Sequence, residues 1–295
     1  MITVMGATGR TGNAIAKLLL GAGENVRAVA RSETRLAALT ALGAETMAGD
    51  AGDTAFLTRA FQGVDAVYTL LPHDPAELDY HGAQRRMGEA IAAAIQNTGV
   101  QRVVFLSSVG ADQPAGTGFV TSLHDQEERL RQLDGVHVLN LRPGSFFENF
   151  HEMLPLIRQE GVAGDVVTPD LRIPMVATRD IAGAAAAALK ARDWNGVVVR
   201  ELLGPRDLSY AEAVTILGER IGKPDLAYVQ FSEAEMAGAL TQMGCSNDFA
   251  RMYVELAHAI NQGVVKSLEV RTAASTTPTR FEDYAGELAQ AYFAV

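Results

Sequence analysis

Three glycines near the start of the chain have a spacing that suits phosphate binding. They stand in the segment Gly6-Ala7-Thr8-Gly9-Arg10-Thr11-Gly12, directly after the short apolar run Ile2–Met5. In such a loop the first glycine permits a tight turn, the second lets the backbone approach a pyrophosphate, and the third lets the next helix pack closely. The amide groups and the dipole at the start of that helix attract the anion. The pattern predicts a dinucleotide-binding loop, with a turn that holds no ligand as the alternative. The residues predicted to contact the cofactor are Gly6, Thr8, Gly9, Arg10, Thr11 and Gly12.

The residues after the second apolar run indicate which dinucleotide the loop would select. Asn25–Ala30 is expected to be a strand, and Arg31 and Ser32 follow it. An acidic residue at this position would bind the ribose 2′-hydroxyl of NAD. A guanidinium is planar and always charged, so it suits a phosphate instead, and Arg10 and Arg35 could add positive charge. We therefore predict NADP rather than NAD, with a solvated surface arginine as the alternative.

The elements that must position these residues alternate along the first half of the chain. Apolar runs typical of buried strands alternate with helical patterns, which indicates a parallel sheet covered on both faces. Right-handed crossovers make such a sheet doubly wound. The predicted fold class is α/β, with a Rossmann-type doubly wound domain in residues 1–150. The expected strands are Ile2–Met5, Asn25–Ala30, Glu45–Ala48, Ala66–Leu71, Arg102–Ser107 and Val136–Leu141. The expected helices are Thr11–Leu20, Leu36–Leu42, Phe56–Phe61, Leu78–Gln96 and Ser122–Leu133.

The alternation weakens after Pro143. We expect residues 151–295 to return partly to the edge of the sheet and otherwise to form a smaller, mainly helical substrate lobe. An interface between two such parts is a favourable place for a small-molecule site. The expected elements are helices at Ile181–Lys190 and Tyr210–Ile221, a strand at Val197–Leu203, and a helical stretch at Ser232–Gly263.

The composition limits the class of protein. The chain has 295 residues, of which 48% are hydrophobic and 20% charged, so it can bury a sizeable core and is not disordered as a whole. Its 25 basic and 35 acidic residues give a net charge of −10, which disfavours non-specific nucleic-acid binding. The single cysteine, Cys245, cannot form an intrachain disulfide. With no apolar run of membrane-spanning length and no signal-peptide pattern, we expect a cytoplasmic protein that binds neither membrane nor nucleic acid, with a homodimer as the candidate assembly.

Several segments resemble the NmrA-like branch of the atypical short-chain dehydrogenases/reductases. Besides the glycine loop they are Gly49-Asp50, Phe105–Ser108, Leu141–Asn149 (LRPGSFFEN) and Ala177–Ala182 (ATRDIA). They span residues 1 to about 190, and the last third is similar only through Thr277–Tyr284. The resemblance implies a fold that binds NADP and a second lobe that covers the nicotinamide.

The resemblance also implies roles for residues that follow the expected strands. Asp50 would approach the adenine, Ser107 and Ser108 would lie near the nicotinamide ribose, and Leu70, Leu71 and Pro72 would line the cofactor path. Open α/β sheets bind their ligands at the carboxyl ends of their strands, so the positions of these residues independently favour the same roles. Each residue could instead be structural, Pro72 by ending its strand.

The acid that ordinary members of the wider superfamily use is missing. No tyrosine of this chain has a lysine four residues later, so the Tyr-x-x-x-Lys pair is absent. Many relatives carry a lysine where this chain has His124, which could bond the ribose or donate a proton near neutral pH. A helix-surface histidine is the alternative. His73 and His81 have acidic neighbours but no well-spaced third ligand, so no metal is expected.

Hydride transfer does not require an acid when the product is stable as an anion or takes its proton from solvent. Quinones, azo compounds and cationic dyes behave in this way. The leading hypothesis is an NADPH-dependent reductase of a quinone-like or other conjugated, electron-poor acceptor, with Phe146, Phe147 and Met243 in an apolar substrate pocket. For these three residues a place in the core is the alternative. A non-catalytic NADP(H)-binding redox sensor and a redox-neutral isomerase or lyase stay open as other functions.

Overall fold

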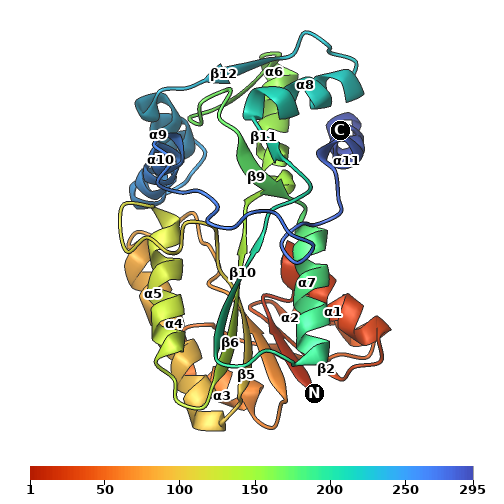
Figure 1. The fold of residues 1–295 in the computed structure, drawn as a ribbon, viewed down its shortest axis with the longest axis vertical. Helices are drawn as coiled ribbons and strands as arrows, with labels where there is room; N and C mark the ends of the chain where they lie inside the picture. Colours follow the sequence, from red (N-terminus) through yellow and green to blue (C-terminus); the bar gives the residue numbers. More distant parts are fainter. Residues whose placement is uncertain (295) are drawn as a thin grey trace.

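A seven-stranded parallel sheet forms the larger part of the computed structural model, which describes residues 1–294 (Figure 1). The strand order is β10-β6-β5-β4-β1-β2-β3. Neighbouring strands pair in parallel throughout, so the predicted doubly wound α/β fold is confirmed. The strands are β1 (Ile2–Met5), β2 (Val26–Ala30), β3 (Glu45–Ala48), β4 (Ala66–Thr69), β5 (Arg102–Leu106), β6 (His137–Pro143) and β10 (Val197–Leu202).

Three helices cover each face of this sheet (Figure 1). One face carries α1 (Arg10–Gly21), α2 (Glu33–Ala41) and α7 (Thr178–Ala191), and the other carries α3 (Thr54–Phe61), α4 (Tyr80–Thr98) and α5 (Phe119–Arg131). Each face has its own apolar core, and both are fully closed to solvent at residues such as Ile15 and Ile181 on one side and Ile91 and Leu130 on the other. Burying such a side chain stabilises the fold by about 1.5–3 kcal/mol. The two cores therefore hold the carboxyl ends of the strands in fixed positions.

A smaller unit lies beyond the carboxyl ends of these strands (Figure 1). It contains the helices expected at Tyr210–Ile221 and within Ser232–Gly263, but also two small sheets that the sequence pattern did not predict, in the orders β11-β9-β7 and β12-β8. Its strands are β7 (Ser145–Phe146), β8 (Val162–Asp165), β9 (Ile173–Val176), β11 (Asp207–Leu208) and β12 (Ala227–Gln230). Its helices are the 3₁₀ helix η1 (Phe147–Met153), α6 (Leu154–Gln159), α8 (Tyr210–Arg220), α9 (Glu233–Gln242), α10 (Asn247–Asn261) and α11 (Phe281–Phe293).

The chain passes between the two parts several times. After β9 it returns through α7, which packs on α1, and through β10, which pairs with β6 from Val197 opposite Val138. The segment 262–280 then runs back across the junction to α11 (Figure 1). There Arg271 donates hydrogen bonds to the carbonyl oxygens of Leu203 and Gly204. The second half of the chain thus also builds part of the large sheet. The division into two domains at residue 150 stays a prediction.

Candidate cofactor and substrate site

The glycine loop joins β1, which lies between β4 and β2 in the sheet, to α1. Gly6 has a φ of +62°, a left-handed conformation that glycine adopts without strain. A Cβ atom on Gly12 would lie 2.4 Å from the carbonyl oxygen of Gly6, and a Cβ on Gly6 would lie 2.7 Å from Cδ2 of Leu70. Gly9 is the N-cap residue of α1, whose first turn has neither a side-chain cap nor an acidic residue. The loop is thus a cradle of bare backbone at a positive helix end, which fits a dinucleotide diphosphate.

The side chains of the loop have separate tasks. Thr11 is buried, and its hydroxyl oxygen lies 3.2 Å from the hydroxyl of Tyr68 on β4. Its contact to a cofactor would therefore be made by its backbone amide. Arg10 is exposed and donates to the carbonyl oxygen of Glu148 at 3.2 Å, which connects the loop to the smaller unit. Thr8 accepts a hydrogen bond from Arg35 through its carbonyl oxygen at 3.0 Å.

Two arginines flank the glycine loop on the side of β2. Arg31 follows β2, is exposed, and has Nη1 3.6 Å from Oδ2 of Asp74. Arg35 lies one helical turn further on, in α2, and its guanidinium reaches the glycine loop. Ser32 is the N-cap of α2 and accepts from the amide of Arg35 at 3.4 Å. A guanidinium pair beside a phosphate cradle fits the predicted 2′-phosphate, although the hydroxyl of Ser32 also has a structural task.

The residues after β3 and β4 differ in what they offer to a cofactor. Asp50 is exposed after β3, and its carboxylate accepts from the amide of Gly52 at 2.9 Å, so its contact with adenine stays a prediction. After β4, Leu70 packs directly against Gly6. The side chain of Leu71 points into the core instead, so it could reach the cofactor only through its backbone. Pro72 accepts a hydrogen bond from Gln84 at 2.8 Å, which fixes the start of the loop.

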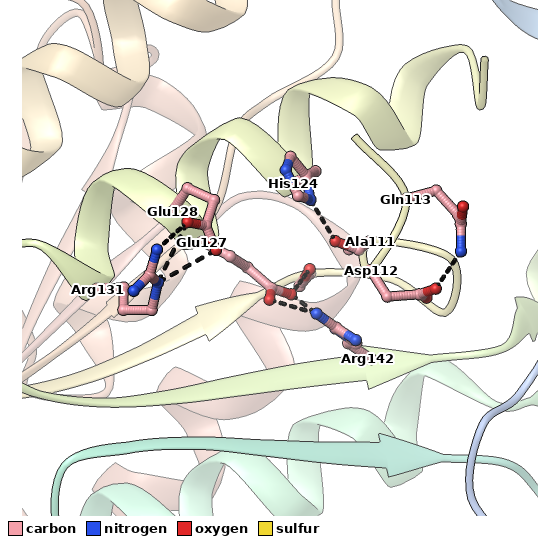
Figure 2. Close-up of polar contacts among 9 residues, drawn as sticks. Ala111, Asp112, Gln113, His124, Glu127, Glu128, Arg131 and Arg142 are labelled. Atoms are coloured by element: carbon pink, nitrogen blue, oxygen red, sulfur yellow. Dashed lines mark hydrogen bonds and ion pairs between the residues drawn. The ribbon is translucent and has the colours of Figure 1, made fainter. Parts of the chain in front are cut away.

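A buried ionic network joins the carboxyl ends of β5 and β6 (Figure 2). Glu127 of α5 accepts hydrogen bonds from Nε and Nη2 of Arg142 at 2.9 and 2.6 Å. The hydroxyl of Ser107 donates to the same carboxylate. Ser107, Glu127 and Arg142 are all buried. The bidentate contact between Glu127 and Arg142 therefore replaces the water that each charge would otherwise bind. Ser107 is therefore committed to Glu127, while the hydroxyl of Ser108 donates to the carbonyl oxygen of Val109 at 2.9 Å.

His124 lies on the same helix and points toward the loop that follows β5 (Figure 2). Its Nδ1 is 2.9 Å from the carbonyl oxygen of Ala111. A carbonyl oxygen only accepts, so Nδ1 carries the proton and Nε2 of the neutral ring is an acceptor. A half-buried His124 could thus accept a hydrogen bond from a ribose hydroxyl, whereas donating a proton would require the charged imidazolium. Its role stays a prediction.

The three predicted substrate residues do not gather in one place. Phe146, in β7, is half-buried and packs at the edge of the core beneath α1 and α7. Phe147 is fully buried and its ring lies 5.1 Å from that of Phe281, so it has a core position rather than the accessible position that a substrate contact requires. Met243 follows α9 and is 72% exposed, so it has no fixed surroundings. For Phe146 and Met243, a substrate contact stays a prediction.

Sequence reasoning missed an aromatic cluster between the two parts. Tyr80, Phe119 and Met252, from α4, α5 and α10, are buried together, with Phe249 and His73 against them. The phenol of Tyr80 is hydrogen-bonded to Nδ1 of His73. The clustered residues come from elements far apart in the chain, so no local spacing could have indicated that they meet.

Two of the segments that carry the family resemblance also meet in space. The carboxylate of Glu148 accepts from the amide of Thr178 at 3.0 and 3.1 Å and from its hydroxyl at 2.6 Å. Glu148 therefore binds the start of α7 in place of a local capping side chain. The backbone carbonyl oxygen of Glu148 also accepts a hydrogen bond from Arg10, and this second contact holds the smaller unit against the glycine loop.

The two histidines near β4 do not converge on a metal. His73 is bonded to Tyr80, and Nδ1 of His81 lies 2.7 Å from the hydroxyl of Ser122. Within residues 1–294 there is no group of three or more His, Cys, Asp or Glu side chains that could hold a metal ion. Over the same residues, no helix combines the length and apolar composition needed to cross a membrane.

Comparison with known proteins places this geometry in a family. The model of the NmrA-like family matches residues 1–285. A (4-alkanoyl-5-oxo-2,5-dihydrofuran-3-yl)methyl phosphate reductase of Streptomyces griseus is 31% identical over 99% of both chains. An NAD(P)H azoreductase of Xenophilus azovorans is 28% identical over 87% of this chain and 86% of its own. The crystal structure of the NADPH-dependent quinone oxidoreductase QOR2 of Escherichia coli, complexed with NADPH, superposes with a TM-score of 0.82 at 25% identity, over 98% of this chain and 99% of the other. The chain belongs to the NmrA-like family.

Proposed function

We propose that this protein is a reductase that uses NADPH to reduce a conjugated, electron-poor acceptor such as a quinone or an unsaturated carbonyl compound. The observation that carries the proposal is the cradle formed by Gly6, Gly9 and Gly12, which leaves the start of α1 free for a diphosphate. Arg31 and Arg35 beside it support NADPH over NADH. When bound, NADPH supplies the hydride.

The names of the relatives support this class of acceptor. They describe a quinone oxidoreductase, an azoreductase and the reductase of an oxo-dihydrofuran that carries an alkanoyl group. All three compounds are conjugated and accept a hydride without needing a strong acid in the protein. The absence of the Tyr-x-x-x-Lys pair in this chain agrees with such an acceptor.

In this proposal the residues of the chain bind the cofactor, orient it toward the acceptor and enclose both. The helix end and the arginines hold the phosphates, and Leu70 closes the cradle on the side of β4. The network of Ser107, Glu127 and Arg142 fixes the carboxyl ends of β5 and β6, while His124 presents an acceptor nitrogen. Fixed groups of this kind lower the barrier by holding the reactants in a reactive orientation.

The test is titration calorimetry with NADPH and NADH, followed by NADPH oxidation against a panel of acceptors. The panel contains a quinone, an azo dye, a cationic triphenylmethane dye and an acylated unsaturated lactone. We expect NADPH to bind more tightly than NADH and to be oxidised by at least one acceptor. If neither nucleotide binds the folded protein, the proposal is wrong.

A redox sensor is the second candidate, and the missing Tyr-x-x-x-Lys pair is the observation that favours it. A sensor would bind NADP⁺ and NADPH with clearly different affinities and turn over no member of the panel. The same two measurements therefore separate the two functions.

A further inference from the structure

The pair formed by His73 and Tyr80 has no task in the site described so far. Tyr80 is 1% exposed, and its hydroxyl has one hydrogen-bond partner among the described residues, Nδ1 of His73. The imidazole ring stacks on the ring of Tyr80 at 5.7 Å between centroids and meets the edge of Phe119 at 5.3 Å. The imidazole is therefore held in one orientation by two aromatic rings and one hydrogen bond.

The hydrogen bond determines which nitrogen of His73 carries the proton. Burial raises the pKa of Tyr80 well above its ordinary range, so its phenol stays protonated and donates to Nδ1. Desolvation lowers the pKa of His73 to about 4, so the ring is neutral near pH 7. The proton of the neutral ring is then on Nε2, the opposite of the arrangement in His124.

His73 is also reached by solvent, although the surrounding protein desolvates its ring. The residue stands three positions after Leu70, which contacts the glycine cradle, at the carboxyl end of β4. That edge of the sheet is where open α/β folds bind their ligands.

The smaller unit holds this loop from the other side. The amide of Ser246, at the start of α10, donates to the carbonyl oxygen of Pro75 at 2.8 Å, and its hydroxyl donates to that of Glu77 at 2.5 Å. The carboxylate of Asp248 accepts from the amide of Tyr80 at 2.8 Å. The loop that carries His73 is thus fixed between the cofactor cradle and α10.

We propose that Nε2–H of His73 donates a hydrogen bond to the carbonyl oxygen of the acceptor while negative charge develops there. The inference rests on the proposed function and narrows it to acceptors that carry such an oxygen. The hydride and its electron pair pass from NADPH, which becomes NADP⁺, to the conjugated acceptor, whose oxygen becomes an anion that water then protonates. His73 keeps its proton, because losing it would create an imidazolate or a buried tyrosinate. A preoriented neutral donor of this kind stabilises an oxyanion in the transition state.

The first test needs neither cofactor nor substrate. We expect ¹⁵N NMR of the full-length protein near pH 7 to show His73 with a proton on Nε2 and none on Nδ1, with the signal assigned by its loss in His73→Gln. In Tyr80→Phe, which removes the donor to Nδ1, this tautomer should lose its preference. A proton on Nδ1 of His73 in the wild type would overturn the inference.

The second test compares two acceptors in steady-state kinetics. A quinone develops an oxyanion on reduction, whereas a cationic triphenylmethane dye takes the hydride at carbon and becomes neutral. In His73→Phe we expect kcat for the quinone to fall about 100–1000-fold, as for the loss of an oxyanion-hole donor. The KM for the quinone, the affinity for NADPH and the rate with the dye should stay within about twofold of the wild-type values. This result is expected if the hydrogen bond forms only in the transition state of quinone reduction. An equal loss with both acceptors, or no loss with the quinone, would contradict the inference.

Matched variants keep this test sharp. His73→Gln retains an N–H donor and should recover part of the quinone rate. If His73→Phe folds poorly because it leaves the phenol of Tyr80 without a partner, the double variant with Tyr80→Phe removes that orphaned group. His258→Phe changes an exposed histidine on α10, paired with Glu233, and should leave both rates unchanged. If none of the acceptors in the panel supports NADPH oxidation by the wild-type protein, the proposed function fails. The NMR measurement still decides which nitrogen of His73 carries the proton.

Discussion

The glycine cradle and the region proposed to bind the acceptor, which we call the acceptor end, are built differently. The cradle is local, because its shape comes from seven consecutive residues and from a Cβ that Gly12 must lack. The acceptor end is assembled from α4, α5, α10 and β6, through the Glu127–Arg142 pair and the aromatic cluster around Tyr80. We therefore expect cofactor binding to depend on backbone shape, whereas the acceptor end is expected to depend on side chains brought together from distant parts of the chain.

The largest effect is expected from the buried ion pair at the acceptor end. Glu127→Ala leaves the guanidinium of Arg142 buried without its partner, which costs about 3–5 kcal/mol in the free energy of unfolding. Urea unfolding measures it. Glu128→Ala is the matched control: its carboxylate binds Arg131 on the exposed face of the same helix, and such pairs add little to stability. Equal losses for both variants would mean that the buried network does not hold this end together.

The second prediction adds a single methyl group to the glycine cradle and concerns the affinity for NADPH. In Gly12→Ala the new Cβ would lie 2.4 Å from the oxygen of Gly6, so we expect the loop to open and the affinity for NADPH to fall at least about 100-fold. Calorimetry measures the affinity, and thermal unfolding shows whether the protein remains folded. Gly21→Ala, in the same helix, places a Cβ where nothing lies within 4 Å and should leave NADPH binding intact. Wild-type affinity in Gly12→Ala would show that the diphosphate binds elsewhere.

The same contrast explains what the sequence could predict. β1 and β3 have the predicted bounds, because each is a short run next to a turn residue. The helical stretch Ser232–Gly263 is two helices instead of one, and Ser246, whose hydroxyl caps the second, was a local signal for the break. α11 was not predicted, although Phe281, Tyr284 and Leu288 have helical spacing and are buried.

The site divides in the same way. The glycine cradle was found from its spacing, since its geometry is contained in neighbouring residues. The partners of Ser107 and the meeting of Tyr80 with Met252 depend on the tertiary fold, so no pattern within one segment could indicate them. The role of Glu127 was missed for this reason, although it lies three residues from His124 on the same helix.

The choice between NADPH and NADH is expected to depend on one exposed charge at the edge of the cradle. Arg31→Ala should weaken NADPH binding by about 1–3 kcal/mol, the range for charge-assisted contacts, and leave NADH binding nearly unchanged. Calorimetry with both nucleotides measures the difference. Arg59→Ala, on α3, is a control that removes an arginine from the same domain without changing the glycine loop. An equal loss of both affinities in Arg31→Ala would exclude a 2′-phosphate contact.

The smallest effect is expected where α10 docks on the loop that carries His73. Ser246 caps α10 and also donates to Glu77, whereas Ser232 caps α9 through a hydrogen bond within its own segment. Replacing either serine by alanine should cost about 1 kcal/mol of unfolding free energy, the usual value for a lost cap. Only Ser246→Ala removes one of the hydrogen bonds that hold the loop, so only this variant should raise KM for the acceptor, by a few-fold, with the affinity for NADPH unchanged. If Ser232→Ala raises KM equally, the effect comes from weakening the smaller unit as a whole, and the acceptor end does not depend on this contact.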